Sequence, residues 1–446
     1  MTADRYVVLG LARVRAPWFG DVARWATSAA LPLDFVKVVS AEEARARLRS
    51  GRPFSAVLVD GGLAALDRDL VELAWQYGCV VIAVDDGRSA RSWRDLGVQA
   101  VLPAAFERDQ LLDALRAVAR PLARGDELAA PTQPSGEPAG TSWRGRLVAV
   151  TGAGGVGRST LAMALATGLA ADPRDRRLVV LADLALDGHQ ALLHDAGDVV
   201  PALLELVEAH RASGLPAEQV RSFCFTVPDR GYDVLLGLRR HRDWTAIRPR
   251  ALDAALDGLR GAYRLVVADV DADVEGEDEC GSIDVEDRNV LARHTLAQAD
   301  LVLVVGQAGV AGVHAHLRVT RDLLELGVVP ERIVPVVNRA PRNPRLRAEA
   351  GTAFARLLGA TNPGTVLASS PVYLPERRRV AELVRDNAAP PALLVKPLTG
   401  AVRGLLDRAG RGGEEPPAIV GATGVPEPVA VVPGSLGSWS DDEAAS

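Results

Sequence analysis

The sequence predicts an α/β protein made of two doubly wound parallel-sheet domains. Strand-length apolar runs alternate with segments of helical period in residues 1–120, and again in residues 143–410. Residues 121–142 between them are rich in Pro, Gly, Ser, Thr and acidic residues and lack an apolar period, which is typical of a flexible linker. Directly after this linker, within residues 147–160, a glycine-rich loop joins an apolar run to a helical pattern.

Length and composition set the first bounds on function. A chain of 446 residues with 48% apolar residues fits two or three domains with α/β cores. A net charge of −6 disfavours a dedicated nucleic-acid binder, which usually has a basic face. Cys79, Cys224 and Cys280 lie far apart, as expected of reduced thiols. With neither a visible secretion signal nor an apolar run long enough to span a membrane, we expect a cytoplasmic protein.

The first domain is predicted from five apolar runs separated by helical segments. The predicted strands are residues 6–11, 34–39, 56–60, 80–85 and 100–102. Ser40 and Glu43 form a capping box that begins one helix, and apolar residues recur at helical spacing in 67–77 and 108–119. Five strands alternating with helices predict a parallel sheet covered on both faces.

Asp60 ends the third predicted strand of this domain, and this length and order resemble the CheY-like receiver domain of response regulators. The resemblance places Asp60 at the phospho-acceptor position. The acidic pair that a receiver has after its first strand is replaced by Gly10 and Leu11, and the lysine after its fifth strand by Pro103. Without those charges, phosphoryl transfer to Asp60 is disfavoured, and we expect a pseudo-receiver that makes contacts instead.

The second domain repeats the alternation over a longer stretch. Its predicted strands are residues 147–150, 178–183, 234–238, 265–269, 301–305 and 333–337. Its predicted helices begin at Ser159 and cover, further on, residues 201–212, 248–259, 289–298, 316–326, 348–357, 377–385 and 393–406. Residues 411–446 are Gly-, Pro- and Ala-rich with an acidic end, and we expect a disordered tail.

The glycine-rich loop has the strand–loop–helix context of a phosphate-binding loop. Its residues fit the pattern G-x-x-x-x-G-K-S/T at Gly152, Gly157 and Ser159, but Arg158 stands where the lysine belongs. Glycines allow backbone N–H groups to surround an anion, and the helix N-terminus adds partial positive charge. An arginine is not equivalent to the lysine, because its planar guanidinium is much bulkier than an ammonium.

Three polar residues follow other predicted strands of this domain. Asp183 and Asp269 each end an apolar strand, and Asn338 follows directly after another. Ligands of parallel α/β sheets bind outside the carboxyl ends of the strands, where all three lie with the loop. An aspartate at the position of Asp269 can hold magnesium, and the amide of Asn338 can pair with a purine edge. The acidic segment 271–276 is expected to be a solvated loop beside this site.

With these features together, residues 143–406 resemble the MinD/ParA group of P-loop ATPases, whose loop reads K-G-G-V-G-K-S/T-T. The loop here reads A-G-G-V-G-R-S-T over residues 153–160. A receiver-like domain ahead of such an ATPase is similar to the CpaE/TadZ proteins that localise pilus-assembly machinery. The acidic segment 269–288 makes the chain most similar to the actinobacterial septum-site-determining (Ssd) branch.

The resemblance implies that the site binds ATP and magnesium. It assigns Ser159 and Asp269 to the metal and Asn338 to the adenine. The residues expected to contact the phosphates are Gly152, Gly154, Gly155, Val156, Gly157, Arg158, Ser159 and Thr160.

Three departures from the family pattern concern the chemistry. Ala153 replaces the signature lysine that reaches the nucleotide of a partner subunit, and Arg158 replaces the loop lysine. The family's second acidic residue after this strand is replaced by Ala185, which leaves Asp183 and Asp187 as weak catalytic candidates. Losing these groups removes most of the transition-state stabilisation, so hydrolysis is expected to be weak or absent.

The sequence thus predicts a regulatory positioning protein with a degenerate ATP-binding domain. The resemblance implies a role in septum-site determination and cell division or in Tad-type pilus localisation, a homodimer, and division-site or pilus-assembly proteins as partners. Peripheral membrane association and recruitment to the pole, septum or inner membrane face follow from the same resemblance. Two alternatives remain open: an active ATPase that cycles between monomer and dimer on a membrane, and a ParA-like DNA-associated partitioning protein.

Overall fold

The computed structural model describes residues 5–13, 16–28, 30–50, 52–88, 91–122, 143–196, 201–376 and 388–408. The chain divides into two compact units. The first contains Met1–Thr141, Leu204–Val220 and Thr245–Leu259, and the second contains the remainder. The predicted helix 377–385, the tail 411–446 and nearly all of the predicted linker lie outside the described residues.

The first unit contains a five-stranded sheet in which every pairing is parallel. The sheet has the order β2-β1-β3-β4-β5, the doubly wound order of flavodoxin-like domains. Its strands are β1 (Tyr6–Leu11), β2 (Leu33–Val38), β3 (Ala56–Asp60), β4 (Val80–Asp85) and β5 (Ala100–Pro103). Its helices are α1 (Pro17–Thr27), α2 (Ala41–Arg49), α3 (Arg68–Gln76), α4 (Trp93–Leu96) and α5 (Arg108–Val118).

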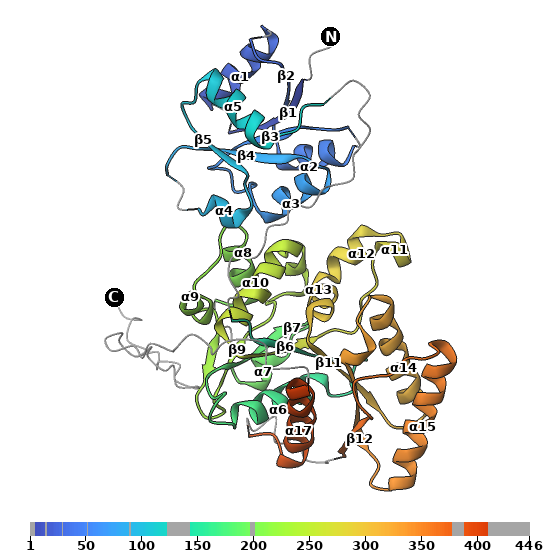
Figure 1. The fold of residues 1–446 in the computed structure, drawn as a ribbon. Helices are drawn as coiled ribbons and strands as arrows, with labels where there is room; N and C mark the ends of the chain where they lie inside the picture. The colour runs from blue at the N-terminus through green and yellow to red at the C-terminus, as the bar shows by residue number, and fades with distance from the viewer. Residues whose placement is uncertain are drawn as a thin grey trace, which may run out of the picture. The chain divides into compact units, whose positions relative to one another are not determined.

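Both faces of this sheet are covered by helices, as the blue part of Figure 1 shows. Alternate residues of one strand point to opposite faces, so Val8 and Leu9 enter different cores. Leu9 packs with residues of α2, α3 and α4, whereas Val8 packs with residues of α1 and α5. Asp60 and Asp85 end β3 and β4 at the carboxyl edge of this sheet.

The second unit contains an eight-stranded sheet with the order β13-β12-β11-β6-β10-β7-β9-β8. All pairings are parallel except that of the edge strand β8, which is antiparallel to β9. The strands are β6 (Arg146–Gly152), β7 (Val179–Leu184), β8 (Phe225–Val227), β9 (Tyr232–Leu235), β10 (Leu265–Val270), β11 (Leu301–Gln307), β12 (Ile333–Ala340) and β13 (Val372–Pro375). β6, which leads into the glycine loop, lies between β10 and β11.

The helices from residue 143 onward vary widely in length. The α-helices are α6 (Arg158–Ala170), α7 (Gln190–Leu193), α8 (Leu203–His210), α9 (Ala217–Arg221), α10 (Pro249–Ala262), α11 (Glu277–Cys280), α12 (Ile283–Arg288), α13 (Val290–Gln298), α14 (Val310–Glu325), α15 (Pro344–Thr361) and α17 (Ala392–Arg408). Two short 3₁₀ helices cover His241–Ala246 and Pro330–Arg332. None of the described helices is both long and apolar enough to cross a membrane.

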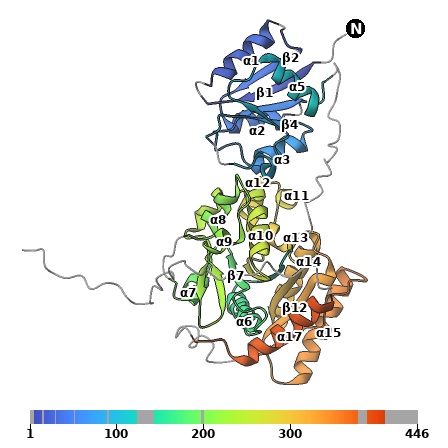
Figure 2. The same ribbon diagram turned by 60° about the vertical axis from the view of Figure 1, so that its left-hand side comes forward.

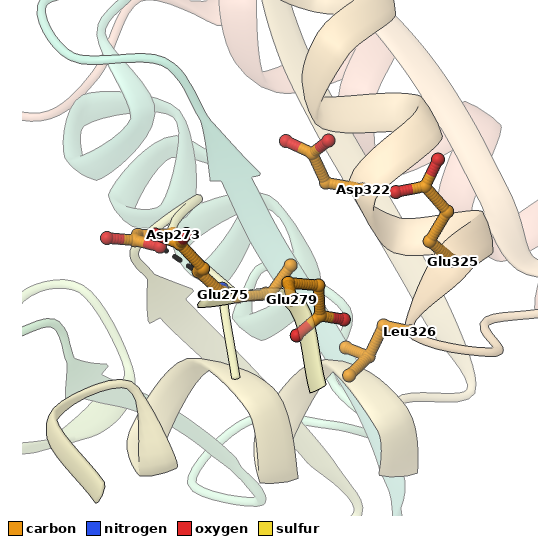
Figure 3. Close-up of a pocket in the computed structure, with 7 residues that line it drawn as sticks. Asp273, Glu275, Glu279, Asp322, Glu325 and Leu326 are labelled. Carbon is orange, nitrogen blue, oxygen red and sulfur yellow. Dashed lines mark hydrogen bonds between the residues drawn. The ribbon is translucent and has the colours of Figure 1, made fainter. Parts of the chain in front are cut away.

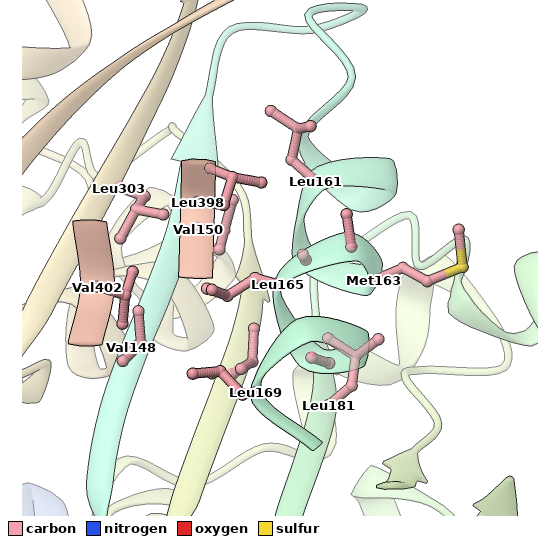
Figure 4. Packing of buried hydrophobic residues seen from close by; sticks show 14 of the residues in the cluster. Val148, Val150, Leu161, Met163, Leu165, Leu169, Leu181, Leu303, Leu398 and Val402 are labelled. Atoms are coloured by element: carbon pink, nitrogen blue, oxygen red, sulfur yellow. The ribbon is translucent and has the colours of Figure 1, made fainter. Parts of the chain in front are cut away.

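Helix α6 is the central helix of the second core. Its sequence is apolar on all sides, which is typical of a helix buried on all sides. On one side it packs against the sheet through residues such as Leu161 and Leu165, and on another it contacts α17 (Figure 4). Gly168 makes that contact close, because a β-carbon there would lie 2.0 Å from Thr399 Oγ1. The two helices lie side by side in both ribbon views (Figure 1, Figure 2).

The structure therefore has the predicted α/β class, and it differs from the prediction mainly at short elements. The edge strands β8 and β13 were not predicted, because three or four residues are too few to show a period. β9 ends at Leu235 rather than at residue 238. α14 begins at Val310, six residues before the predicted start.

Candidate functional site

The predicted site residues of the second unit lie on one edge of its sheet. Gly152 ends β6, and Asp183 and Asp269 lie at the carboxyl ends of β7 and β10. The two aspartates are direct neighbours across the β7–β10 pairing. Asn338 lies near the end of β12, on the other side of β6. The parallel topology therefore brings together residues that are far apart in the sequence.

The glycine loop is shaped to present backbone donors. Gly155 and Gly157 have φ values of +76° and +93°, a region that residues with a side chain rarely adopt. Within the described structure, no backbone N–H of residues 153–157 donates a hydrogen bond. These donors lie at the N-terminus of α6, where the helix dipole adds partial positive charge. Unpaired N–H groups in this arrangement form a site for an anion such as a phosphate.

Asn338 holds this loop from the side. Its Nδ2 donates to the carbonyl oxygen of Val156 at 2.7 Å, and its Oδ1 accepts from the N–H of Arg339 at 2.9 Å. Gly157 is required beside it, because a β-carbon there would lie 2.7 Å from Asn338 Nδ2. The amide that is predicted to read adenine thus has a protein partner on both atoms and supports the loop.

Arg158, the residue that departs from the motif, turns toward the strand ends. Its Nε donates to Asp269 Oδ1 at 2.7 Å, and its Nη1 donates to Asp271 Oδ1 at 2.8 Å. The side chain of Asp269 is fully buried, and that of Arg158 is 15% exposed. Burial opposes the positive charge, but the two carboxylates outweigh it and raise the pKa of Arg158. The guanidinium is therefore a fixed cation within this site.

Gln190 completes the surroundings of Asp269. Its Nε2 donates to Asp269 Oδ2 at 2.8 Å and to the carbonyl oxygen of Ser159 at 3.2 Å. Its backbone N–H donates to Asp183 Oδ2 at 2.9 Å. One glutamine thus links the end of β7, the end of β10 and the first turn of α6.

Asp183 is buried beside Asp269 without a cation of its own. Its Oδ1 has no hydrogen-bond partner among the described residues. Burial, and then the negative charge of Asp269, raise the pKa of Asp183 to about 7. A carboxyl group with this pKa is partly protonated near neutral pH, which reduces the repulsion between the two strand ends.

The region after β7 differs from the catalytic arrangement that its family resemblance would require. Ala185 is fully buried and has no functional group. Asp187, the second weak catalytic candidate, is 80% exposed, and its Oδ1 lies 3.4 Å from His241 Nδ1. A carboxylate this exposed is not fixed in position as a general base would be.

A cavity of about 500 Å³ lies between Asp187 and the glycine loop, and its lining includes Gly152, Ala153, Gly154, Arg158, Asp271 and Arg318.

A magnesium ion does not fit the predicted metal residues as they are arranged. Both oxygens of Asp269 already accept hydrogen bonds from protein donors, Arg158 and Gln190. A divalent cation at this carboxylate would also lie beside the fixed positive charge of Arg158. Within the described ranges, no group of three or more His, Cys, Asp or Glu side chains is arranged to hold a metal ion.

The acidic segment after β10 forms one wall of a second cavity, of about 280 Å³ (Figure 3). Asp273, Glu275 and Glu279 come from this segment, and Asp322 and Glu325 come from α14. Asp273 accepts from Arg288 Nη2 at 2.7 Å and from Asn289 Nδ2 at 3.0 Å. The segment is thus structured by its own ion pairs rather than being a freely solvated loop.

The first unit has a polar cluster of its own at the end of β3. Asp60 is 5% exposed, and Arg13 donates to both of its carboxylate oxygens. Arg13 also donates to Asp86 Oδ2 at 3.2 Å. The N–H of Gly62 donates to Asp60 Oδ1 at 2.9 Å. The predicted phospho-acceptor is therefore already paired with a cation of its own chain.

Three residues of these two clusters, Arg13, Asp86 and Gln190, were not singled out from the sequence, and Asp271 was predicted only as part of the solvated loop 271–276. Arg13 and Asp86 each lie just beyond a predicted strand of the first domain, and Asp271 lies two residues after Asp269. Position relative to a strand end was therefore the available signal for these three. Gln190 lies seven residues after Asp183, within no recognisable motif.

Comparison with known proteins finds solved structures that are similar to this chain. No protein-family model and no curated protein matches the sequence. A ParA family ATPase from Chlorobium tepidum TLS is similar at 17% identity with a TM-score of 0.44, covering 58% of this chain and 98% of that one. The septum site-determining protein MinD complexed with Mg-ADP, from Pyrococcus horikoshii OT3, is similar at 17% identity with a TM-score of 0.43, covering 60% and 99%. An ATP complex of a variant of McdA from Cyanothece is similar at 17% identity with a TM-score of 0.43, covering 60% and 97%.

Proposed function

We propose that this protein binds the polyphosphate of ATP at the glycine loop and uses the occupied site as a docking or dimerisation switch. The observation that carries the proposal is the loop itself. Residues 153–157 present unpaired N–H groups at the N-terminus of α6, directly beside a cavity large enough for a ligand. The resemblance of this loop to that of MinD/ParA ATPases names ATP as the ligand.

The same site supports binding rather than turnover. Ala153 and Ala185 supply no charged group, and Arg158 is held by Asp269 and Asp271. Phosphoryl transfer depends on charge placed around the reacting phosphate and on a positioned water. We therefore favour a nucleotide-responsive positioning protein over an ATPase that cycles with hydrolysis.

The cellular role follows from the family resemblance alone. Septum-site determination and Tad-type pilus localisation are both consistent with a receiver-like domain ahead of a MinD-like domain. Recruitment to the pole, septum or inner membrane face, with homodimerisation and division-site or pilus-assembly partners, belongs to the same proposal. Association with DNA is the less favoured alternative, because the net charge of −6 opposes contact with phosphate backbones.

Two measurements on the full chain test this proposal. Isothermal titration calorimetry with ATP is expected to show saturable binding, and light scattering with and without ATP reports any change in oligomeric state. A phosphate-release assay with magnesium is expected to show no release above that of buffer. Absence of ATP binding in any buffer would contradict the nucleotide site, and sustained phosphate release would favour the cycling ATPase.

A further inference from the structure

Arg158 lies where a metal ion would link the strand-end carboxylates to a bound phosphate, and we infer that its guanidinium takes the place of magnesium in this site. The inference rests on the proposed nucleotide site and states which form of the nucleotide it binds. The ligand is the polyphosphate without a divalent cation. Three properties of the cluster support this role: its geometry, the number of occupied carboxylate oxygens and the N–H donors that remain on Arg158.

The guanidinium of Arg158 makes one charge-assisted hydrogen bond to each of two carboxylates, Asp269 and Asp271. Nε and Nη1 of Arg158 lie 2.7 and 2.8 Å from single oxygens of Asp269 and Asp271. Such bonds are short and directional, and the planar fork of arginine allows two carboxylates to be bound at once. A lysine in this position would have one point charge and could not reproduce both contacts in the same plane.

The four carboxylate oxygens of this pair all have protein donors. Asp269 Oδ2 accepts from Gln190 Nε2 at 2.8 Å, and Asp271 Oδ2 accepts from the N–H of Leu186 at 2.7 Å. The remaining two oxygens accept from Arg158. Magnesium requires near-octahedral oxygen ligands or ordered waters held by carboxylates. An ion at these oxygens would therefore compete with the existing donors and would lie beside the fixed positive charge of Arg158.

Asp183 does not supply an alternative metal ligand. It is 1% exposed and does not line the 500 Å³ cavity beside the loop. Gly188 and Gly237 pack so closely on it that a β-carbon at either would lie 3.0 Å or less from one of its atoms. Its unpaired oxygen is enclosed by protein and has no open path to a ligand in the cavity.

N–H groups of the Arg158 guanidinium remain available to donate to a phosphate. Arginine has five N–H groups, and two of them are used by Asp269 and Asp271. The side chain also lines the cavity together with Gly152 and Gly154 of the loop. A phosphate held by the loop N–H groups would therefore meet a cation that is already anchored to the strand ends. The guanidinium would then supply the positive charge that a P-loop enzyme takes from its metal ion.

The first test compares ATP binding to the full chain in magnesium and in excess EDTA, by calorimetry. The wild-type dissociation constant is expected to differ by less than about threefold between the two buffers. In Arg158→Lys the carboxylates are released, so magnesium is expected to strengthen ATP binding by about tenfold or more. Arg321→Lys makes the same change at an exposed position on α14 and is expected to behave as the wild type. Magnesium dependence of that size in the wild type would overturn the inference.

The second test uses manganese alone, so its result does not depend on nucleotide binding. Electron paramagnetic resonance is expected to detect no tightly bound Mn²⁺ on the wild type and a new site on Arg158→Ala, in which both carboxylates have lost the guanidinium. Circular dichroism confirms that each variant is folded. Tight Mn²⁺ binding by the wild type that Asp269→Asn abolishes would contradict the inference. If ATP fails to bind in both buffers, the proposed function is wrong, and the manganese result still decides the role of Arg158.

Discussion

The guanidinium of Arg13 binds both oxygens of the Asp60 carboxylate, with Nε–Oδ2 and Nη2–Oδ1 distances of 2.9 and 3.0 Å. Asp60 ends the third strand of a five-stranded parallel sheet, and the sequence resemblance predicts it to be at the phospho-acceptor position of a receiver. The bidentate pair places a protein cation on this carboxylate, and Asp86 holds that cation from the other side. The cluster at Asp60 and the cluster at Asp269 therefore have the same arrangement, in which one arginine is bound between two aspartates.

The Arg13–Asp60 pair predicts that small phosphodonors do not modify Asp60. Both carboxylate oxygens are engaged, and neither Gly10 nor Leu11 can hold the metal that such a transfer requires. Incubation of the full chain with acetyl phosphate and magnesium is expected to leave its intact mass unchanged. A phosphoryl adduct that disappears in Asp60→Asn would show that the prediction is wrong.

Arg13 is also predicted to stabilise its unit. Arg13→Ala leaves the nearly buried Asp60 without its charged donor, and we expect a larger loss in the free energy of unfolding than an exposed ion pair would give. The matched control is Arg47→Ala, which removes an exposed pair with Glu43 and should cost only about 0.3–0.5 kcal/mol. Urea denaturation followed by circular dichroism measures both. Equal effects of the two substitutions would mean that the Asp60 pair is no stronger than a surface pair.

Two glycines of the phosphate loop provide a matched test of its backbone. Gly157→Ala introduces a side chain at a φ of +93° and within 2.7 Å of Asn338 Nδ2, so we expect a loss of at least about 1–2 kcal/mol of stability and of ATP binding. Gly154→Ala points into open space at a position without positive φ, and stability should change little. Thermal unfolding and calorimetry with ATP check both variants. If Gly154→Ala weakens ATP binding without changing stability, a phosphate must lie directly against this residue.

The raised pKa of Asp183 predicts a pH-dependent stability. Because the folded-state pKa of about 7 exceeds the ordinary value of 3.8, the folded protein holds the proton more tightly than the unfolded chain. The stabilisation is complete below the ordinary value and is lost as the pH rises through about 7. Asp183→Asn should remove this loss and raise the free energy of unfolding at pH above 7 by up to about 4 kcal/mol, because each unit of pKa difference corresponds to about 1.36 kcal/mol.

The control for Asp183 is Asp187→Asn, four residues away and exposed. It should change the free energy of unfolding by no more than about 0.5 kcal/mol at any pH. Urea titrations of the wild type and both variants between pH 4 and 9 are sufficient for the comparison. If the stability of the wild type depends on pH in the same way as that of Asp183→Asn, the raised pKa of Asp183 is contradicted.

Most of the fold could be predicted from the sequence because its strands are short, continuous apolar runs. The bounds of β1, β3 and β4 coincide with the predicted ranges 6–11, 56–60 and 80–85, which are rich in Val, Leu and Ile. β8 could not be found in this way. It has three residues, and its antiparallel pairing depends on the neighbouring strand rather than on its own pattern.

The site was predictable to the level of strand ends but not of side-chain partners. Asp183, Asp269 and Asn338 end strands of a parallel sheet, and topology alone places them near the loop. The partners of Arg158 lie 111 and 113 residues further along the chain, and the direction of a long side chain is set by packing and charge. The sequence indicated that Arg158 departs from the motif, whereas its role as an anchored cation required the coordinates.

The bond from Asn338 Nδ2 to the carbonyl of Val156 has a consequence for the thermodynamics of any ligand that binds to the loop. A glycine-rich segment in solution has high conformational entropy, and fixing one residue costs about 1–2 kcal/mol. Here β12 holds the centre of the loop before a ligand arrives, so that entropy is lost during folding and not during association. Preorganisation of this kind favours tighter binding from the same set of contacts. Asn338→Ala would therefore be expected to make ATP binding entropically less favourable, even though the asparagine contributes no contact to the phosphates.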